Sequence, residues 1–259
     1  MLALDGFDEA NLAEIESLNQ RGGRTLSLAD LISDGTLSVE MGAYLLVKMA
    51  SGACVLTAAQ ASGTGKSTLL ANLLGFLPAG ERIISTSDAG VITSGLSRTD
   101  SACYLAHEIG AGRWYGYIWG RAVGDFFKLS TRGHRLAAAI HADSMDELEI
   151  SLTGPPLDIP GEAIKAMNLI VFMGMQRTTA AILRRVTKIY ELADSEYRPA
   201  YEWDAKRDEF MPQELALSSS VLEGEKLASA TELVTQLVRA QIRDFRAMRS
   251  AVLDWYGRQ

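Results

Sequence analysis

The sequence has little of several features that would each point to a particular class of protein. It contains only two cysteines, Cys54 and Cys103, and neither lies in a CxxC or histidine-rich segment, so the sequence predicts neither a disulfide nor a metal site there. No apolar run is long enough to cross a bilayer, and the N-terminal segment lacks the basic residues of a signal peptide. We therefore expect a cytoplasmic protein that does not itself span a membrane.

The sequence also lacks an excess of basic residues. It has 25 Lys and Arg against 32 Asp and Glu, which gives a formal net charge of −7 at pH 7. General binding to nucleic-acid backbones requires a basic face. We therefore expect no nucleic-acid partner.

The segment from Ala58 to Leu70, AAQASGTGKSTLL, is the feature around which the chain is organised. It follows an apolar segment typical of a strand and precedes a Leu- and Ala-rich segment typical of a helix. Gly63 and Gly65 allow the backbone N–H groups to turn inward towards a polyphosphate, which also faces the positive end of the helix. This is the setting of a phosphate-binding loop, with a Gly-rich turn that happens to carry Lys-Ser as the alternative.

Within this loop, Lys66 is expected to reach the β- and γ-phosphates, and the Ser67 hydroxyl to bind Mg²⁺. The sequence therefore predicts ATP and Mg²⁺ as ligands. The residues expected to contact the nucleotide are Ala61, Ser62, Gly63, Thr64, Gly65, Lys66, Ser67 and Thr68. The loop departs from the G-x-x-x-x-G-K-[ST] pattern at Gln60, where the pattern has glycine, and we expect this to make the loop stiffer.

Alternating strand-like and helix-like segments predict an α/β fold with a mostly parallel sheet and helices on both faces. The expected strands are 53–58, 82–87, 113–119, 135–141 and 169–173, with 181–192 as an edge strand paired with 201–203. The expected helices are 8–18, 25–32, 38–49, 66–77, 100–109, 122–129, 145–152 and 161–167, with Asp143 as the cap of the helix at 145–152.

The pattern of apolar residues from 222 to 256 predicts one long amphipathic helix. We expect this helix to pack against its own domain or against a neighbouring domain. Its basic residues Arg239, Arg243, Arg246 and Arg249 fall on a second face, either solvated or available to an acidic partner. We expect an N-terminal helix and linker at 1–23, an NTPase domain at 24–212 and a C-terminal helical extension at 213–259.

Three segments in this order resemble one known family. They are 25–38 (TLSLADLISDGTLS), the phosphate loop with 69–84, and 133–144 (GHRLAAAIHADS). They resemble the secretion ATPases that drive type II and type IV secretion, pilus assembly and archaeal surface filaments, and most of all the tight-adherence pilus branch. The resemblance covers about 24–190, and only the first 23 residues could stand in for the separate N-terminal domain of that family.

The resemblance implies a RecA-like P-loop core that assembles as a ring, usually a hexamer, with ATP between or beside subunits. It also implies a membrane-embedded assembly platform as a partner and a place at the inner face of the membrane. His141 matches the family's conserved histidine and is expected at a strand end, where it would sense the γ-phosphate.

Two carboxylates of the family pattern are missing at the matching places. The family has a Glu-Asp pair where this chain has Ser87-Asp88, and a Walker B strand ending in Gly-Glu where it has Gly116-Tyr117. Asp88 is the first candidate for the catalytic carboxylate. Glu108 is the second, on the predicted helix at 100–109, where it could equally be a surface charge.

Phosphoryl transfer also needs positive charge on the transition state. Arg98, Arg113 and Arg121 are candidates for supplying it across a subunit boundary.

The sequence is compatible with three functions. The first is a diverged, slow ATPase coupled to assembly or transport. The second is a non-hydrolysing, nucleotide-gated structural subunit that pairs with an active paralogue. The third is a small-molecule kinase, which the absence of an Arg-rich lid insertion disfavours.

Overall fold

The computed structural model describes residues 6–20, 22–179, 181–217 and 221–258. In this part of the chain nine strands form one sheet, in the order β2-β3-β5-β1-β6-β7-β8-β9, with β4 beside β3. The strands from β2 to β6 are parallel, and β6 to β9 are antiparallel. The predicted α/β class with a mostly parallel sheet is therefore confirmed.

The elements have the following bounds. The strands are β1 (Val55–Ala58), β2 (Arg82–Ser85), β3 (Ala102–Ile109), β4 (Tyr117–Ile118), β5 (Arg135–Ile140), β6 (Leu169–Arg177), β7 (Ile182–Ala193), β8 (Glu196–Asp204) and β9 (Glu209–Pro212). The helices are α1 (Gly6–Ser17), α2 (Leu28–Ser33), α3 (Val39–Ala50), α4 (Lys66–Leu74), α5 (Ala89–Gly95), α6 (Arg121–Lys128), the 3₁₀ turn η1 (Leu129–Arg132), α7 (Met145–Thr153), α8 (Gly161–Ile164), α9 (Glu214–Leu217), α10 (Val221–Arg239) and α11 (Phe245–Tyr256).

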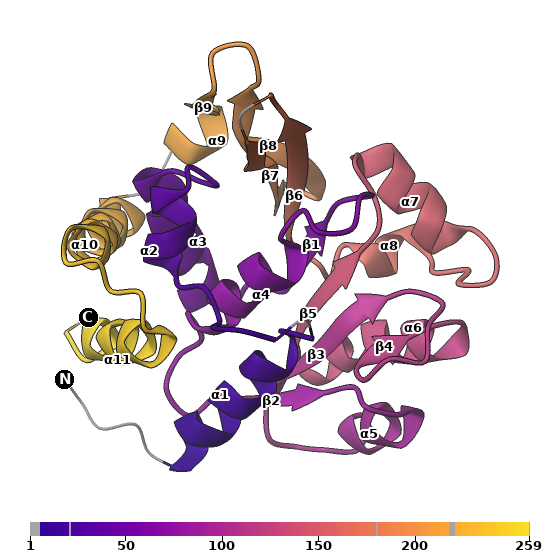
Figure 1. The fold of residues 1–259 in the computed structure, drawn as a ribbon. Coiled ribbons are helices and arrows are strands. Elements are labelled where there is room, and N and C mark those ends of the chain that lie inside the picture. Colours follow the sequence, from indigo (N-terminus) through magenta and orange to yellow (C-terminus); the bar gives the residue numbers. More distant parts are fainter. Residues whose placement is uncertain (1–5, 21, 180, 218–220, 259) are drawn as a thin grey trace.

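Helices cover both faces of the parallel part of the sheet (Figure 1). One face packs against α1, α3, α4, α10 and α11 around one hydrophobic core, and the other against α5 to α8 around a second. Side chains of β3 alternate between the two cores, because Cys103 and Leu105 face the first and Tyr104 and Ala106 the second. This two-sided burial leaves the carboxyl ends of the parallel strands as the edge where polar groups gather.

The segment 100–109 was predicted as a helix, and this prediction is wrong. Residues Ala102–Ile109 form β3, which is buried on both faces. A strand buried on both faces reads as a continuous apolar run, which hydrophobic periodicity does not distinguish from a buried helix. The predicted strand 113–119 shrinks to the two residues of β4, and Trp114, Tyr115 and Trp119 around it are exposed.

The segment at 181–192 was predicted as an edge strand, but β7 lies inside the sheet between β6 and β8. Asp143 was predicted to cap the helix that follows it. Instead Ser144 is the N-cap of α7, accepting a hydrogen bond from the Glu147 N–H, and the Asp143 carboxylate faces the phosphate loop.

The predicted long C-terminal helix is two helices, α10 and α11. The break contains Gln241 in a left-handed conformation with φ of 51°, and Asp244 caps the start of α11. Both helices contribute to the same core as α1, α3 and α4, through side chains such as Val234 and Trp255.

Of the four arginines of this segment, Arg239 is exposed, and the other three pair with acids of the N-terminal part of the chain. Arg249 is buried beside Asp8, Arg246 pairs with Glu9, and Arg243 lies 3.8 Å from Asp30. These pairs attach the C-terminal helices to the N-terminal part of the chain.

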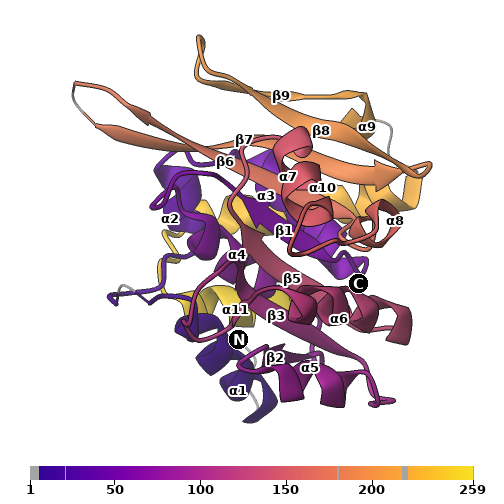
Figure 2. The ribbon, with the colours of Figure 1, turned by 90° about the vertical axis from the view of Figure 1, so that its right-hand side faces the viewer.

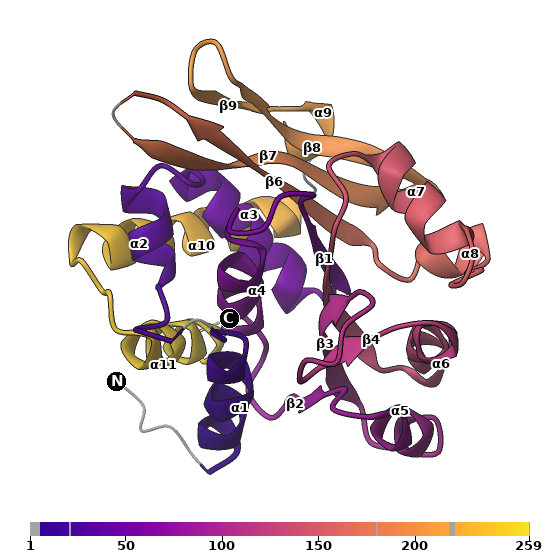
Figure 3. The same ribbon diagram turned by 45° about the vertical axis from the view of Figure 1, so that its right-hand side comes forward.

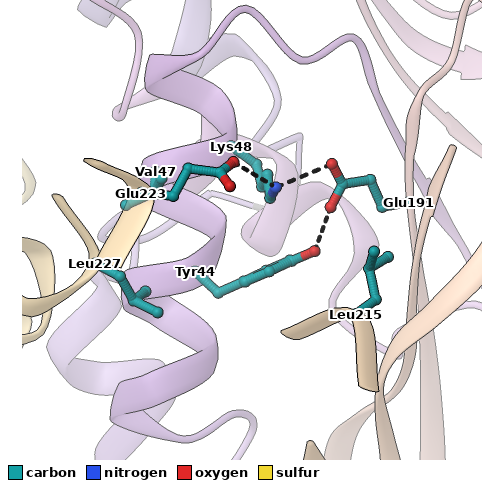
Figure 4. A pocket seen from close by; sticks show the side chains of 7 residues that line it. All are labelled: Tyr44, Val47, Lys48, Glu191, Leu215, Glu223 and Leu227. Atoms are coloured by element: carbon teal, nitrogen blue, oxygen red, sulfur yellow. Dashed lines mark hydrogen bonds and ion pairs between the residues drawn. The ribbon is translucent and has the colours of Figure 1, made fainter. Parts of the chain in front are cut away.

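A half-buried ionic cluster also holds α10 in place (Figure 4). The Lys48 ammonium on α3 lies 3.0 Å from Glu191 on β7 and 3.4 Å from Glu223 on α10. The Tyr44 hydroxyl donates to Glu191, and burial raises the pKa of this phenol, so it stays protonated. The charges are satisfied within the cluster, which indicates a structural role.

Replacing Asp8 by asparagine is expected to lower the free energy of unfolding by about 2 kcal/mol. Arg249 is 2% exposed, and its Nη2 lies 2.8 Å from Asp8 Oδ1, so the substitution removes the counter-charge of a buried guanidinium. Urea denaturation measures the change. The matched control is Glu9→Gln, which breaks the exposed pair with Arg246 and should lower the free energy of unfolding much less than Asp8→Asn. Equal losses for the two variants would contradict the prediction.

Candidate functional site

The segment between β1 and α4 forms a tight loop at the carboxyl edge of the sheet. Gly63 and Gly65 have φ of +80° and +103°, in the left-handed region that favours glycine. A Cβ at Gly65 would lie 3.2 Å from the Met173 methyl group, so this position is also crowded. Gln60 does not have a positive φ, which explains why the first position of the loop does not need the glycine of the usual pattern.

Lys66 begins α4 and is buried, and its ammonium donates to the Ala59 carbonyl at 2.8 Å. Burial lowers the pKa of Lys66, while the nearby carboxylates of Glu108 and Asp143 raise it in part. The next residue, Ser67, is partly exposed, and its hydroxyl has no hydrogen-bond partner among the residues described. An ammonium with further donors and an unengaged hydroxyl suit a polyphosphate and its metal ion.

Glu108 and His141 come together at the same edge, on neighbouring strands. Glu108 is near the end of β3, and His141 directly follows β5, which lies between β3 and β1. His141 Nε2 lies 3.3 Å from Glu108 Oε1, and His141 Nδ1 lies 2.6 Å from the Gln60 carbonyl. The Nδ1 atom therefore donates to Gln60, and the imidazole joins the carboxylate to the first residue of the loop.

Glu108 was predicted to lie on a helix, and the strand β3 gives it a different setting. The register pairs Glu108 with Tyr117 on β4, the residue where the family pattern places a glutamate. Burial and the Glu108 carboxylate raise the pKa of Tyr117, so its phenol stays protonated beside the acid. A carboxylate therefore lies on the strand next to Tyr117.

Asp143 holds the other side of Gln60. Its Oδ1 accepts a hydrogen bond from the Gln60 N–H at 2.7 Å, and Glu147 accepts one from the Asp143 N–H at 2.8 Å. His141 and Asp143, in the segment between β5 and α7, therefore bind the two backbone groups of Gln60, and Glu147 on α7 supports Asp143.

Asp88, the first candidate for the catalytic carboxylate, lies elsewhere on the edge. It follows β2, which β3 and β5 separate from β1. Its Oδ1 accepts hydrogen bonds from the N–H groups of Gly90 at 2.7 Å and Val91 at 3.2 Å, so it caps α5. Among the residues that the structure describes, the side-chain hydrogen bonds of Asp88 go to Ser87, Gly90 and Val91 and not to the loop.

The arginines that were candidates for stabilising charge in a neighbouring subunit are on the surface. Arg98 pairs with Asp100, and the Arg121 guanidinium is 95% exposed and 3.9 Å from Asp125. Arg113 is exposed as well.

A different arginine touches the phosphate loop within the same chain. Arg184 on β7 donates from Nε to the Gly63 carbonyl at 2.8 Å. No motif marks this residue in the sequence. It reaches the loop because β7 pairs with β6, which pairs with β1, and the sequence alone does not reveal that order.

Comparisons with known proteins give distant likenesses. No protein-family model matches the chain. It is 23% identical over 209 residues to an uncharacterized protein of Methanocaldococcus jannaschii, which covers 71% of this chain and 38% of that protein, so the chain spans well under half of this relative. Among solved structures it is similar to the VirB11 ATPase from the Brucella suis type IV secretion system in complex with sulphate. That match has a TM-score of 0.44 and 16% identity over 73% of this chain and 56% of the other.

Proposed function

We propose that this protein binds ATP with Mg²⁺ at the loop Gly63–Ser67 and hydrolyses it, as a diverged secretion-type motor with a RecA-like core. The observation that carries the proposal is the contact chain from the Glu108 carboxylate through His141 to Gln60 at the start of the loop. This contact chain supports an acid and an orienting group beside the Lys-Ser segment that we propose as the phosphate cradle. The resemblance of three sequence segments to secretion ATPases supports the motor role.

In this proposal each residue has a distinct task. The loop N–H groups and Lys66 hold the β- and γ-phosphates, and the Ser67 hydroxyl would be the side-chain ligand of Mg²⁺, an ion that is usually held by few protein groups together with substrate phosphates. Bound Mg²⁺ would neutralise charge on the phosphates. Glu108 orients the attacking water and accepts its proton as the γ-phosphoryl group leaves ADP, and His141 fixes the position of Glu108.

Glu108 also favours turnover over the non-hydrolysing alternative. A nucleotide-gated scaffold would need the loop to bind nucleotide. It would not need an acid such as Glu108 in contact with His141, the residue that binds the start of the loop. The test is phosphate release by the wild-type chain, alongside ATP binding measured by calorimetry. ATP binding with phosphate release at background would support the scaffold and refute the ATPase.

We expect the chain to self-associate, and to do so more strongly with a non-hydrolysable ATP analogue and Mg²⁺. The family resemblance implies a ring, a homo-oligomer such as a hexamer or a mixed ring with an active paralogue, in which nucleotide lies near a subunit boundary. Light scattering at several protein concentrations, with and without the analogue, measures the mass. A strict monomer under both conditions would contradict this expectation.

The same resemblance suggests a membrane-embedded assembly platform as the partner, with this protein on the cytoplasmic side at the inner face of the membrane. In the described part of the chain, no helix combines the length and apolar character of a membrane span.

A further inference from the structure

The antiparallel pair β6 and β7 extends well past the body of the protein. Figures 2 and 3 show the far ends of the two strands projecting beyond α2. Gln176 and Arg177 at the end of β6 and Ile182 at the start of β7 are exposed. The opposite half of β6 is buried, because Leu169–Phe172 pair with β1. The pair is thus an arm whose base is fixed in the sheet.

The middle of this arm rests on the phosphate loop. Arg184 on β7 contacts Gly63 through the hydrogen bond from Nε, and its Cδ lies 3.9 Å from where a Cβ of Gly65 would be. Met173 on β6 approaches Gly65 more closely, at 3.2 Å from the same point. Both left-handed glycines of the loop therefore have the arm as a neighbour.

The hydrogen bond from Arg184 controls the direction of one peptide group. In a trans peptide the carbonyl and the following N–H point in opposite directions. While the Gly63 carbonyl faces Arg184, the Thr64 N–H must face away from the arm. Rotation of this peptide changes ψ of Gly63, where the lack of a Cβ gives little steric resistance, and a hydrogen bond to the Gly63 carbonyl therefore helps to keep the peptide in one orientation.

We propose that Arg184 is a positioning residue that keeps the Thr64 N–H turned towards the phosphates, and that the β6–β7 arm thereby regulates nucleotide affinity. A partner that moves the arm would loosen or tighten the loop. By linkage, nucleotide on the loop would in turn steady the arm. This inference rests on the proposed nucleotide site.

Two substitutions separate the hydrogen bond from the charge. The glutamine Nε2 is as many bonds from Cα as the arginine Nε, so Arg184→Gln keeps a donor for Gly63 and loses the charge. Arg184→Met loses both. Arg184→Met should weaken Mg·ADP and Mg·ATP alike by about fivefold, the effect of one typical hydrogen bond, while Arg184→Gln stays within about twofold of wild type. Calorimetry measures both affinities. The control is Arg198→Met, an exposed arginine on β8 paired with Asp194, which should change neither.

Hydrogen exchange tests the coupling to the arm. Mg·ADP should slow exchange of β6 and β7 amides in the wild type and in Arg184→Gln, but not in Arg184→Met at saturating nucleotide. If Arg184→Met kept the nucleotide affinity of the wild type and the same slowing of amide exchange in β6 and β7, the proposal would be overturned. The proposal would also be overturned if Arg184→Gln and Arg184→Met lost equal affinity for Mg·ATP and none for Mg·ADP. That result would show a direct contact between the arginine charge and the γ-phosphate. Both measurements depend on nucleotide binding and not on hydrolysis. An absence of hydrolysis would therefore count against the proposed ATPase but not against the positioning role of Arg184. A wild type that binds neither nucleotide would refute both.

Discussion

Lys66→Ala is expected to weaken ATP affinity by at least about a hundredfold and to reduce phosphate release to background. The Lys66 ammonium is buried at the start of α4, donates to the Ala59 carbonyl, and lies close enough to Glu108 and Asp143 for their charges to act on its pKa. Removing it leaves those carboxylates facing the phosphates without an intervening cation. A single well-placed electrostatic group of this kind contributes about 10²–10³.

Calorimetry with Mg·ATP and a phosphate-release assay measure the two effects. The matched control is Lys128→Ala on α6, which removes an exposed lysine paired with Asp125 and should leave both unchanged. Circular dichroism checks that both variants fold. Equal ATP affinity in the wild type and Lys66→Ala would show that the loop is not the nucleotide site.

The backbone geometry of the loop between β1 and α4 could be predicted because it depends on adjacent residues. The left-handed glycines, the buried Lys66 and the start of α4 are all set within a few residues of one another. The alternation of strands and helices was also visible, and the predicted β1, β2, β5 and β6 and most helices are present within a few residues. Local backbone preferences and hydrophobic periodicity carry this information.

The role of Glu108 could not be predicted in the same way. Its neighbours His141 and Tyr117 are separated from it in sequence, and the sheet order β3-β5-β1 brings the first of them close. The helix predicted at 100–109 could equally have put the side chain on a surface, so Glu108 was only the second candidate after Asp88. A strand buried on both faces has the same apolar composition as a buried helix, and only its pairing with β2 and β5 reveals it.

The contacts of the C-terminal segment and of the arm are also non-local. Nothing near Arg249 in the sequence indicates that it is buried beside Asp8, and nothing near Arg184 indicates Gly63. Basic residues at helical spacing suggested a solvated face, yet the break at Gln241 turns α11 so that Arg249 points inward. Arg249 and Arg184 each bind a partner far away in the sequence, the Asp8 carboxylate and the Gly63 carbonyl respectively.

Glu108→Gln is expected to lower the single-turnover rate of ATP hydrolysis by about 10³ while leaving ATP affinity within a few fold of wild type. The amide has the shape of the carboxylate but cannot accept a proton from water, and the proposed task of Glu108 arises only in the transition state. Affinity depends instead mainly on the loop N–H groups and the Lys66 ammonium, all of which the variant retains. The wild type should therefore bind ATP and turn it over, and the variant should bind it and hold it.

The matched control for Glu108→Gln is Asp88→Asn, the same loss of charge at the other candidate carboxylate. Asp88 Oδ1 caps α5 through Gly90 and Val91, and β3 and β5 separate its strand from β1. Asp88→Asn should therefore reduce the rate less than about threefold, with any loss arising from a weaker helix cap. Rapid-quench hydrolysis at saturating ATP distinguishes the two acids. Turnover that survives Glu108→Gln and disappears with Asp88→Asn would move the catalytic role to Asp88, and would mean that the contact between Glu108 and His141 only supports the loop.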